Sequence, residues 1–230
     1  MKNPLRADPT RTTGLRRQFE REMKRRFGAL KKDIQKLIVE EDAFNLNPKK
    51  PLVIMQAKEW AFQTSEQKIK SFNKWFQHRV DEKVLTVDHA GKPWTAKYVD
   101  SAYKKGSIRA YTDTHKKSLM KSQDFYEGSK DQFLKSAFMQ PERMSKLRLL
   151  GTRVFEQLKG VTAEMGSKMN VLLAEGMAHG KGPADIARQM ANNITGLTNK
   201  RAKVIARTEV IYAHAEGQLD SFEDLGVEEL

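Results

Sequence analysis

The sequence predicts a mostly α-helical protein, from the spacing of its apolar residues and the residues at its helix ends. Apolar side chains recur every three or four positions over long stretches, which is the repeat of one helix face. Prolines and glycines stand where helices begin and end. Within this class we expect an elongated multi-helix assembly with a basic N-terminal helix, a C-terminal helical module and at most a small β-hairpin near residues 84–94.

Composition excludes several kinds of chemistry. The 230-residue chain has no cysteine, which rules out disulfides, thiol catalysis and Cys-ligated zinc. Its apolar runs are far shorter than the ~18–20 residues that a membrane span needs, so no membrane partner is expected. The five histidines have no short-spaced metal motif, and no paired carboxylates stand out as acid and base. We therefore expect no metal, no cofactor and no catalytic residues.

The positive charge of the chain lies in its first half. Residues 1–125 carry 28 Lys and Arg against 15 Asp and Glu, a net of +13, whereas residues 126–230 carry 14 of each. Such asymmetry indicates that the N-terminal half meets a polyanion, with nucleic acid as the leading candidate. An acidic protein partner and a merely solvated basic surface remain alternatives.

The first predicted part, residues 1–47, is an extended arm followed by a basic amphipathic helix over 13–43. The apolar stripe of this helix resembles a coiled-coil seam and is interpreted as a protein-contact seam: Phe19, Met23, Phe27, Leu30, Ile34 and Leu37. Cations surround it and are expected to contact nucleic acid or an acidic partner: Arg16, Arg17, Arg21, Lys24, Arg25, Arg26, Lys31 and Lys32. The alternative is an ordinary core helix with solvated charges.

The second predicted part, residues 52–125, is a basic helical region that follows a proline-containing linker at 45–51. Residues 52–62 could be a short strand or the entry to a helix. A clear helix begins at Ser65, and residues 84–94 have the turn chemistry of a loop or small hairpin. A short helix then ends at Gly106, and the polar residues 110–127 are expected to form a connection that a partner orders.

The third predicted part, residues 126–230, is a helical module. Helices are expected at 131–139, 141–158, 161–177, 183–191 and 200–225, with breaks at Gly160, Gly180 and Gly196. A stripe of Met165, Met169, Leu172 and Leu173 is expected to pack in the core.

The last helix carries two charges without a partner on their own helix. Its apolar spacing predicts the buried face: Val204, Thr208, Ile211, Ala215, Leu219 and Phe222. Arg207 and Glu209 have no opposite charge one turn away, and they cannot pair with each other because they point about 200° apart. Three alternatives remain open for these two residues: they are solvated by water, they form ion pairs with a neighbouring helix or subunit, or they are catalytic.

The same helix resembles a known signature. Residues 205–209, Ile-Ala-Arg-Thr-Glu, followed by Ala213, Gly217 and the Gly-Val pair at 226–227, resemble the motif of phage Mu F-like minor head proteins, also called phage head morphogenesis proteins. Residues 182–190 are similar to the short helix that precedes that motif, and residues 67–82 and 102–106 are similar to the family's N-terminal half. Members commonly continue into a segment rich in Cys and Trp, which this sequence does not contain.

The resemblance implies a structural virion protein of a tailed phage. Such a protein would be made in the host cytoplasm and would lie inside the phage head near the portal vertex, where several copies could be present in each virion. Its expected partners are the portal protein, the major capsid protein and packaged double-stranded DNA. Arg207, Thr208, Glu209 and Gly217 would be its structural signature residues. The alternatives are a stand-alone nucleic-acid-binding protein and a nuclease or transferase that uses Arg207 and Glu209.

Overall fold

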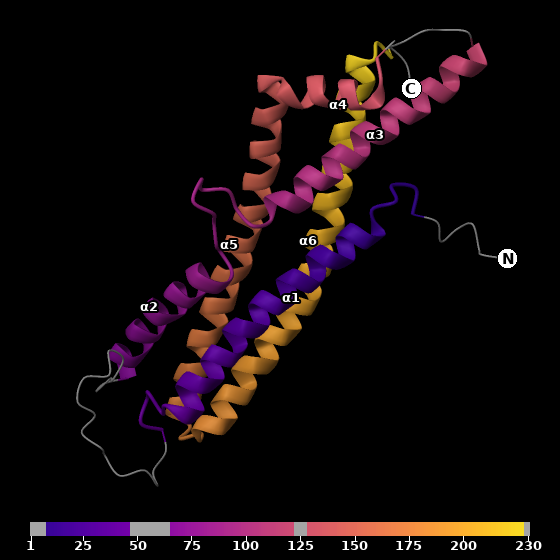
Figure 1. Ribbon diagram of the computed structural model, residues 1–230. Coiled ribbons are helices and arrows are strands. Elements are labelled where there is room, and N and C mark those ends of the chain that lie inside the picture. The colour runs from indigo at the N-terminus through magenta and orange to yellow at the C-terminus, as the bar shows by residue number, and fades with distance from the viewer. Residues whose placement is uncertain (1–7, 47–64, 122–127, 228–230) are drawn as a thin grey trace, which may run out of the picture. The chain divides into compact units, whose positions relative to one another are not determined.

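The computed structural model describes residues 8–46, 65–121 and 128–227 (Figure 1). Its helices are α1 (Thr13–Gln35), the π-helix η2 (Lys36–Glu40), α2 (Ser65–Lys83), α3 (Ala96–Lys121), α4 (Lys130–Met139), α5 (Pro141–Ala178) and α6 (Pro183–Asp224). These described ranges contain no strand, so the mostly α-helical class is confirmed. No helix within them is long and apolar enough to cross a membrane.

The chain divides into two compact units that are discontinuous in sequence. The first unit takes residues 1–20, 87–156 and 203–230, and the second takes 21–86 and 157–202. Helices α1, α5 and α6 each contribute to both units, because a long helix can supply apolar residues to two cores. The units therefore do not coincide with the three consecutive parts, 1–47, 52–125 and 126–230, that the sequence suggested.

Helix α1 begins where the sequence predicts, at Thr13. The carboxylate of Asp8 accepts hydrogen bonds from the Thr13 backbone N–H, at 2.8 Å, and from the guanidinium of Arg16, at 2.8 Å. At its C-terminal end the helix widens into η2, where the N–H of Glu41 reaches back five residues to the carbonyl of Lys36.

The seam of α1 is buried inside this chain and is not a surface for a partner. All six of its residues, from Phe19 to Leu37, are at most 3% exposed. In the first unit, the ring of Phe19 stacks on Tyr98 with a centroid distance of 4.5 Å and meets the edge of Trp94 at 5.7 Å. The expected protein-contact seam is corrected accordingly: a wide apolar stripe is as well satisfied by the chain's own core as by a second protein.

Helix α2 belongs to the second unit and begins at Ser65, as expected. Its buried Phe72 packs against Phe44 and Phe76. The linker at 45–51 and the ambiguous segment at 52–62 lie largely or wholly outside the described residues.

The predicted hairpin near 84–94, which falls mostly in the first unit, is a turn with one bridge, between Val87 and Pro93. Gly91 provides the positive φ of +73° that this turn requires. The carboxylate of Asp88 closes the turn by accepting the backbone N–H groups of Ala90 and Lys92.

Helix α3 is much longer than the sequence predicts. It passes through Gly106 and continues to Lys121, so the expected helix end and the expected connection at 110–127 are both wrong in their described part; residues 122–127 lie outside it. Gly106 is a point of close approach, because a Cβ there would lie 2.0 Å from the carbonyl oxygen of His214 in α6. A mid-helix glycine was therefore mistaken for a helix terminator.

Two more expected breaks, at Gly160 and Gly196, are absent. Both glycines lie inside single long helices, α5 and α6, with no atom near the place of a missing side chain. An exposed glycine costs a helix only about 1 kcal/mol, which packing on its buried side outweighs. The expected break at Gly180 is present: this residue lies in the turn between α5 and α6, with φ of +61°. The expected methionine stripe in α5 is core: Met165, Met169 and Leu173 are fully buried, and Leu172 is half-buried.

The predicted apolar face of α6 is the wrong face. Val204 is 59% exposed and Leu219 is 52% exposed. Over residues 202–221 the buried side instead carries apolar residues, most of them small, together with charged or polar ones: Ala202, Ile205, Ala206, Glu209, Val210, Ala213, His214, Gly217, Asp220 and Ser221. Small residues allow close helix contact and the buried charges have partners, so apolar spacing alone did not identify this face.

Candidate functional site

The candidate site lies in the first unit, where α3 crosses α6. At Gly217 the two backbones touch, since a Cβ there would lie 2.2 Å from the carbonyl oxygen of Tyr103. The buried Ser107 hydroxyl lies 3.2 Å from the Gly217 carbonyl and 3.3 Å from that of Tyr103, within hydrogen-bond distance of both. This close approach brings the next turn of α6, which carries Asp220, next to α3.

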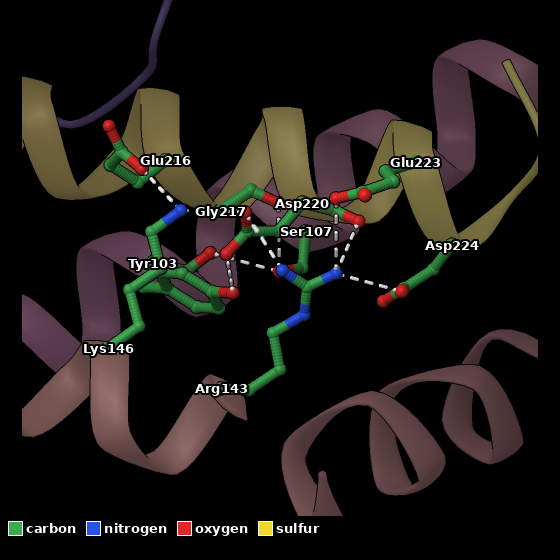
Figure 2. A network of polar contacts seen from close by, with 9 residues as sticks. All are labelled: Tyr103, Ser107, Arg143, Lys146, Glu216, Gly217, Asp220, Glu223 and Asp224. Atoms are coloured by element: carbon green, nitrogen blue, oxygen red, sulfur yellow. Dashed lines mark hydrogen bonds and ion pairs between the residues drawn. The ribbon is translucent and has the colours of Figure 1, made fainter. Parts of the chain in front are cut away.

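Asp220 is the centre of the polar network in Figure 2, and it is only 5% exposed. The phenol of Tyr103, from α3, donates a short hydrogen bond to Oδ2. From α5, Arg143 Nη1 lies 2.8 Å and Lys146 Nζ lies 2.7 Å from Oδ1. One carboxylate of α6 thus joins two neighbouring helices.

The two cations of α5 hold further groups of α6 (Figure 2). Arg143 Nη2 donates to the backbone carbonyl of Asp220 at 2.9 Å and to the carboxylate of Asp224 at 2.8 Å. Lys146 also forms an ion pair with Glu216. Multiple charge-assisted bonds of this kind fix geometry better than a single exposed ion pair does.

The surroundings hold each group of the network in one protonation state. Burial alone would raise the pKa of Asp220, but the hydrogen bonds from Lys146 and Tyr103 and the charge of Arg143 outweigh it, so the pKa is lowered. Burial and the adjacent Asp220 carboxylate raise the pKa of the Tyr103 phenol well above its ordinary value. Asp220 is therefore ionised and Tyr103 protonated at neutral pH. This arrangement is suited to clamping helices rather than to transferring a proton.

A second set of polar contacts between α5 and α6 involves the signature residue Glu209, which is 2% exposed. The guanidinium of Arg153, on α5, binds it with two hydrogen bonds, Nε to Oε2 at 3.1 Å and Nη2 to Oε1 at 3.0 Å. The same guanidinium lies 4.1 Å from the ring centroid of Tyr212, and its bond to Glu209 raises the pKa of Arg153. Glu209 is therefore not a solvated charge: it forms an ion pair with a neighbouring helix, α5.

The other signature residues divide between surface and interior. Arg207 and Thr208 are exposed, whereas Glu209 and Gly217 are buried. Arg207 therefore does not share a site with Glu209. Its expected role in holding the helix has no counterpart among the described contacts.

Sequence reasoning missed most of the network, although a signal for it exists. In α6 the acidic residues Glu209, Glu216 and Asp220 follow one another at intervals of seven and four, which places them on one helix face. Their basic partners occur in α5 at the similar intervals of seven and three: Arg153, Lys146 and Arg143. Complementary stripes on two consecutive helices are typical of an antiparallel pair.

The cations of α1 differ in how they are placed. Arg17, Arg21, Arg25 and Lys32 are exposed, whereas Arg16, Lys24, Arg26 and Lys31 are half-buried. Within the second unit, Arg26 binds Glu22 as well as the carbonyl of Lys83 and the hydroxyl of Thr86. Arg16 is engaged in the first unit by Asp8. Of the exposed members, Arg25 forms an ion pair with Glu22.

Comparisons with models of protein families, with curated proteins and with solved structures find no match to this chain. Within the described ranges there is no group of three or more His, Asp or Glu side chains that could hold a metal ion. The family resemblance thus rests on the motif residues of α6 and on the similar segments upstream.

Proposed function

We propose that this protein is a structural minor head protein of a tailed phage, located inside the head near the portal vertex and acting by binding. The observation that carries the proposal is how the motif helix is built. Glu209 is bound by Arg153, and Gly217 provides the contact with α3. Motif residues with such roles suit a protein whose task is to keep a shape. A nuclease or transferase that used Arg207 and Glu209 finds no support in this geometry.

The proposed protein partner is the portal or the major capsid protein, and the exposed face of α6 supports it. Val204, Tyr212 and Leu219 are 59%, 40% and 52% exposed and recur at intervals of eight and seven along one side of the helix. Apolar side chains on an exposed side of a helix offer an apolar contact to a protein partner.

The proposed nucleic-acid partner is packaged double-stranded DNA. The exposed cations of α1 named above support it, together with the net charge of +13 in residues 1–125. The same observation favours a second candidate, a stand-alone nucleic-acid-binding protein. The two candidates differ in whether head proteins bind the chain.

Head incorporation tests the proposal. The full chain is co-expressed with the portal and major capsid proteins of the same genome, and purified particles are probed for it. We expect the wild-type chain in particles and much less of Leu219→Asp. Leu149→Asp is the matched control, because Leu149 is a 70% exposed leucine on α5, and both variants should keep the wild-type melting temperature. A wild-type chain that is absent from particles and binds neither head protein would contradict the proposal, and tight DNA binding would then favour the second candidate.

A further inference from the structure

A small pocket in the first unit collects cations from segments far apart in the sequence. It has a volume of about 260 Å³, below the ~300–1,000 Å³ of pockets for drug-sized ligands. The loop before α1, one face of α3 and one residue of α6 form its walls. Its charged and titratable lining residues are Arg11, Lys105, Arg109, Asp113, Lys116 and His214.

The pocket has more positive than negative charge. Its one carboxylate, Asp113, is bound to Arg109. Among the residues that the structure describes, Arg11, Lys105 and Lys116 have no carboxylate within ion-pair distance. Three uncompensated cations around a small volume repel one another, and an anionic occupant would relieve that repulsion.

The loop that carries Arg11 is held in an unusual conformation. Arg11 has φ of +53°, in the left-handed region that residues other than glycine seldom adopt. Asp8 fixes it: its carbonyl accepts the N–H of Arg11 at 3.1 Å, and its carboxylate accepts the N–H groups of Thr10 and Thr13. Strained backbone that its surroundings enforce is typical of binding sites.

The α6 wall of the pocket is a buried imidazole. His214 is 2% exposed, and its Nδ1 has no hydrogen-bond partner within the described part of the chain. Burial and the positive charges of Arg109 and Lys105 lower its pKa, against the opposing effects of the Asp8 charge and a hydrogen bond with Gln218, so the ring is neutral near pH 7. A buried polar atom without a hydrogen-bond partner, in the lining of a pocket with surplus cations, is a second sign of a binding site.

We propose that this pocket binds a phosphate group. A phosphate dianion carries more charge than a carboxylate, which suits the surplus of cations, and both guanidinium and ammonium groups are good phosphate donors. The threonine hydroxyls of the lining already donate elsewhere, Thr10 to Asp8 and Thr112 to the carbonyl of Ile108, so the cations supply the recognition. The occupant is free phosphate or the terminal phosphate of a DNA strand. The inference goes beyond the proposed function and does not depend on it.

Titration calorimetry of the full chain with inorganic phosphate, at constant ionic strength, tests the proposal. The pocket variant is Lys105→Gln with Lys116→Gln, and the control is Lys104→Gln with Lys203→Gln, which removes the same charge from exposed positions that do not line the pocket. We expect affinity to fall about tenfold in the pocket variant and less than about twofold in the control. Both should keep the wild-type melting temperature, since all four lysines are exposed.

A second arm identifies the source of the phosphate. A short duplex with 5′-phosphates is compared with the same duplex without them. A preference for the phosphorylated duplex that the pocket variant loses supports the proposal with DNA ends as the source. Pocket-dependent binding of inorganic phosphate without that preference supports it with free phosphate as the source. No pocket-dependent binding in either arm, or equal losses in the pocket and control variants, would overturn it.

Discussion

The ion pair between Glu209 and Arg153 joins two side chains that differ in exposure. Glu209 is 2% exposed, whereas the side chain of Arg153 is 39% exposed. Loss of Arg153 would remove two charge-assisted hydrogen bonds from a buried carboxylate, but loss of Glu209 would leave a guanidinium that can turn to water. The two truncations should therefore not cost the same.

We predict that Arg153→Met lowers the free energy of unfolding by up to about 3–5 kcal/mol, the upper cost of removing one partner from a buried ion pair. Glu209→Gln should cost clearly less, and the double variant should be less destabilised than the sum of the single variants. Urea unfolding of all three variants measures this. Equal costs for the two single variants, or strict additivity, would contradict the asymmetry.

Arg207→Ala is the control for the pair. Arg207 lies two positions from Glu209 but is exposed, so its loss should change the free energy of unfolding by no more than about 0.5 kcal/mol. From the sequence the two charges could not be distinguished, because neither has an opposite charge one turn away on its own helix. Only the position of α5 distinguishes them.

The raised pKa of Tyr103 should make the protein less stable at alkaline pH. Its folded-state pKa is raised above the ordinary 10.0, so above about pH 10 the unfolded chain loses the phenolic proton while the folded chain keeps it. The unfolded state then binds fewer protons, and stability falls as pH rises. We predict a decline above about pH 10 that is shallower in Tyr103→Phe, measured by urea unfolding at a series of pH values. Parallel curves for the wild type and Tyr103→Phe would contradict a raised pKa for the Tyr103 phenol in the folded protein.

At the scale of elements, the contact between α3 and α6 depends on two glycines. A Cβ at Gly106 or Gly217 would lie 2.0 or 2.2 Å from a backbone oxygen of the other helix, which cannot move without separating the helices. We predict that Gly106→Ala and Gly217→Ala each destabilise the protein by roughly 1–3 kcal/mol, as overpacking does. Thermal unfolding measures the effect.

The exposed glycines of the long helices are matched controls. At Gly160 and Gly196 a Cβ would have no atom within 4 Å, so alanine there should stabilise by about 0.5–1 kcal/mol through helix propensity. Opposite signs for the same substitution would separate close packing from propensity. Stabilisation by all four alanines would mean that α3 and α6 do not approach so closely.

The elements were more predictable than their faces. The starts of α1, α2 and α5 follow from polar residues, proline and apolar spacing, which are local in sequence. The exposed face of α6 was mistaken for the buried one, because Val204 and Leu219 are apolar while the buried face holds Glu209 and Asp220. Their burial depends on cations of α5, and a rule that scores one helix at a time cannot include them.

A comparison of two helices would have found that face. Glu209, Glu216 and Asp220 lie as far after Lys181, in the turn between α5 and α6, as their respective partners Arg153, Lys146 and Arg143 lie before it, to within one residue. This equality is the register of an antiparallel pair joined by a short turn. The contribution of Tyr103 could not be predicted in this way, because α3 is remote in sequence and its length was underestimated at Gly106.

For the molecule as a whole, the sequence indicates the helical class but not the grouping of segments. Consecutive parts were expected, whereas each compact unit combines segments that are distant in the chain. Long-range grouping depends on which helix faces match, and composition does not record it. The distribution of charge, by contrast, is a property of the sequence itself, and it supports the remaining prediction.

We predict that the exposed cations of α1 contribute to binding of duplex DNA. Arg17, Arg21 and Lys32 are exposed, and no ion pair to them occurs in the described part of the chain. If all three contact phosphates, replacing them with Gln should reduce the slope of log affinity against log salt concentration by up to about 2.7, at ~0.9 for each phosphate contact on B-DNA. Fluorescence anisotropy with a labelled duplex over a range of salt concentrations measures this slope.

The control removes the same charge from the electrically balanced half of the sequence. Lys135, Arg148 and Lys203 are exposed there, and their replacement with Gln lowers the net charge by the same three units. If binding follows total charge, both triple variants should lose equal slope, whereas contacts made by α1 should leave the control slope close to that of the wild type. An unchanged slope in the α1 variant would assign those cations to solvent. The DNA contact in the proposed function would then have to lie elsewhere on the chain.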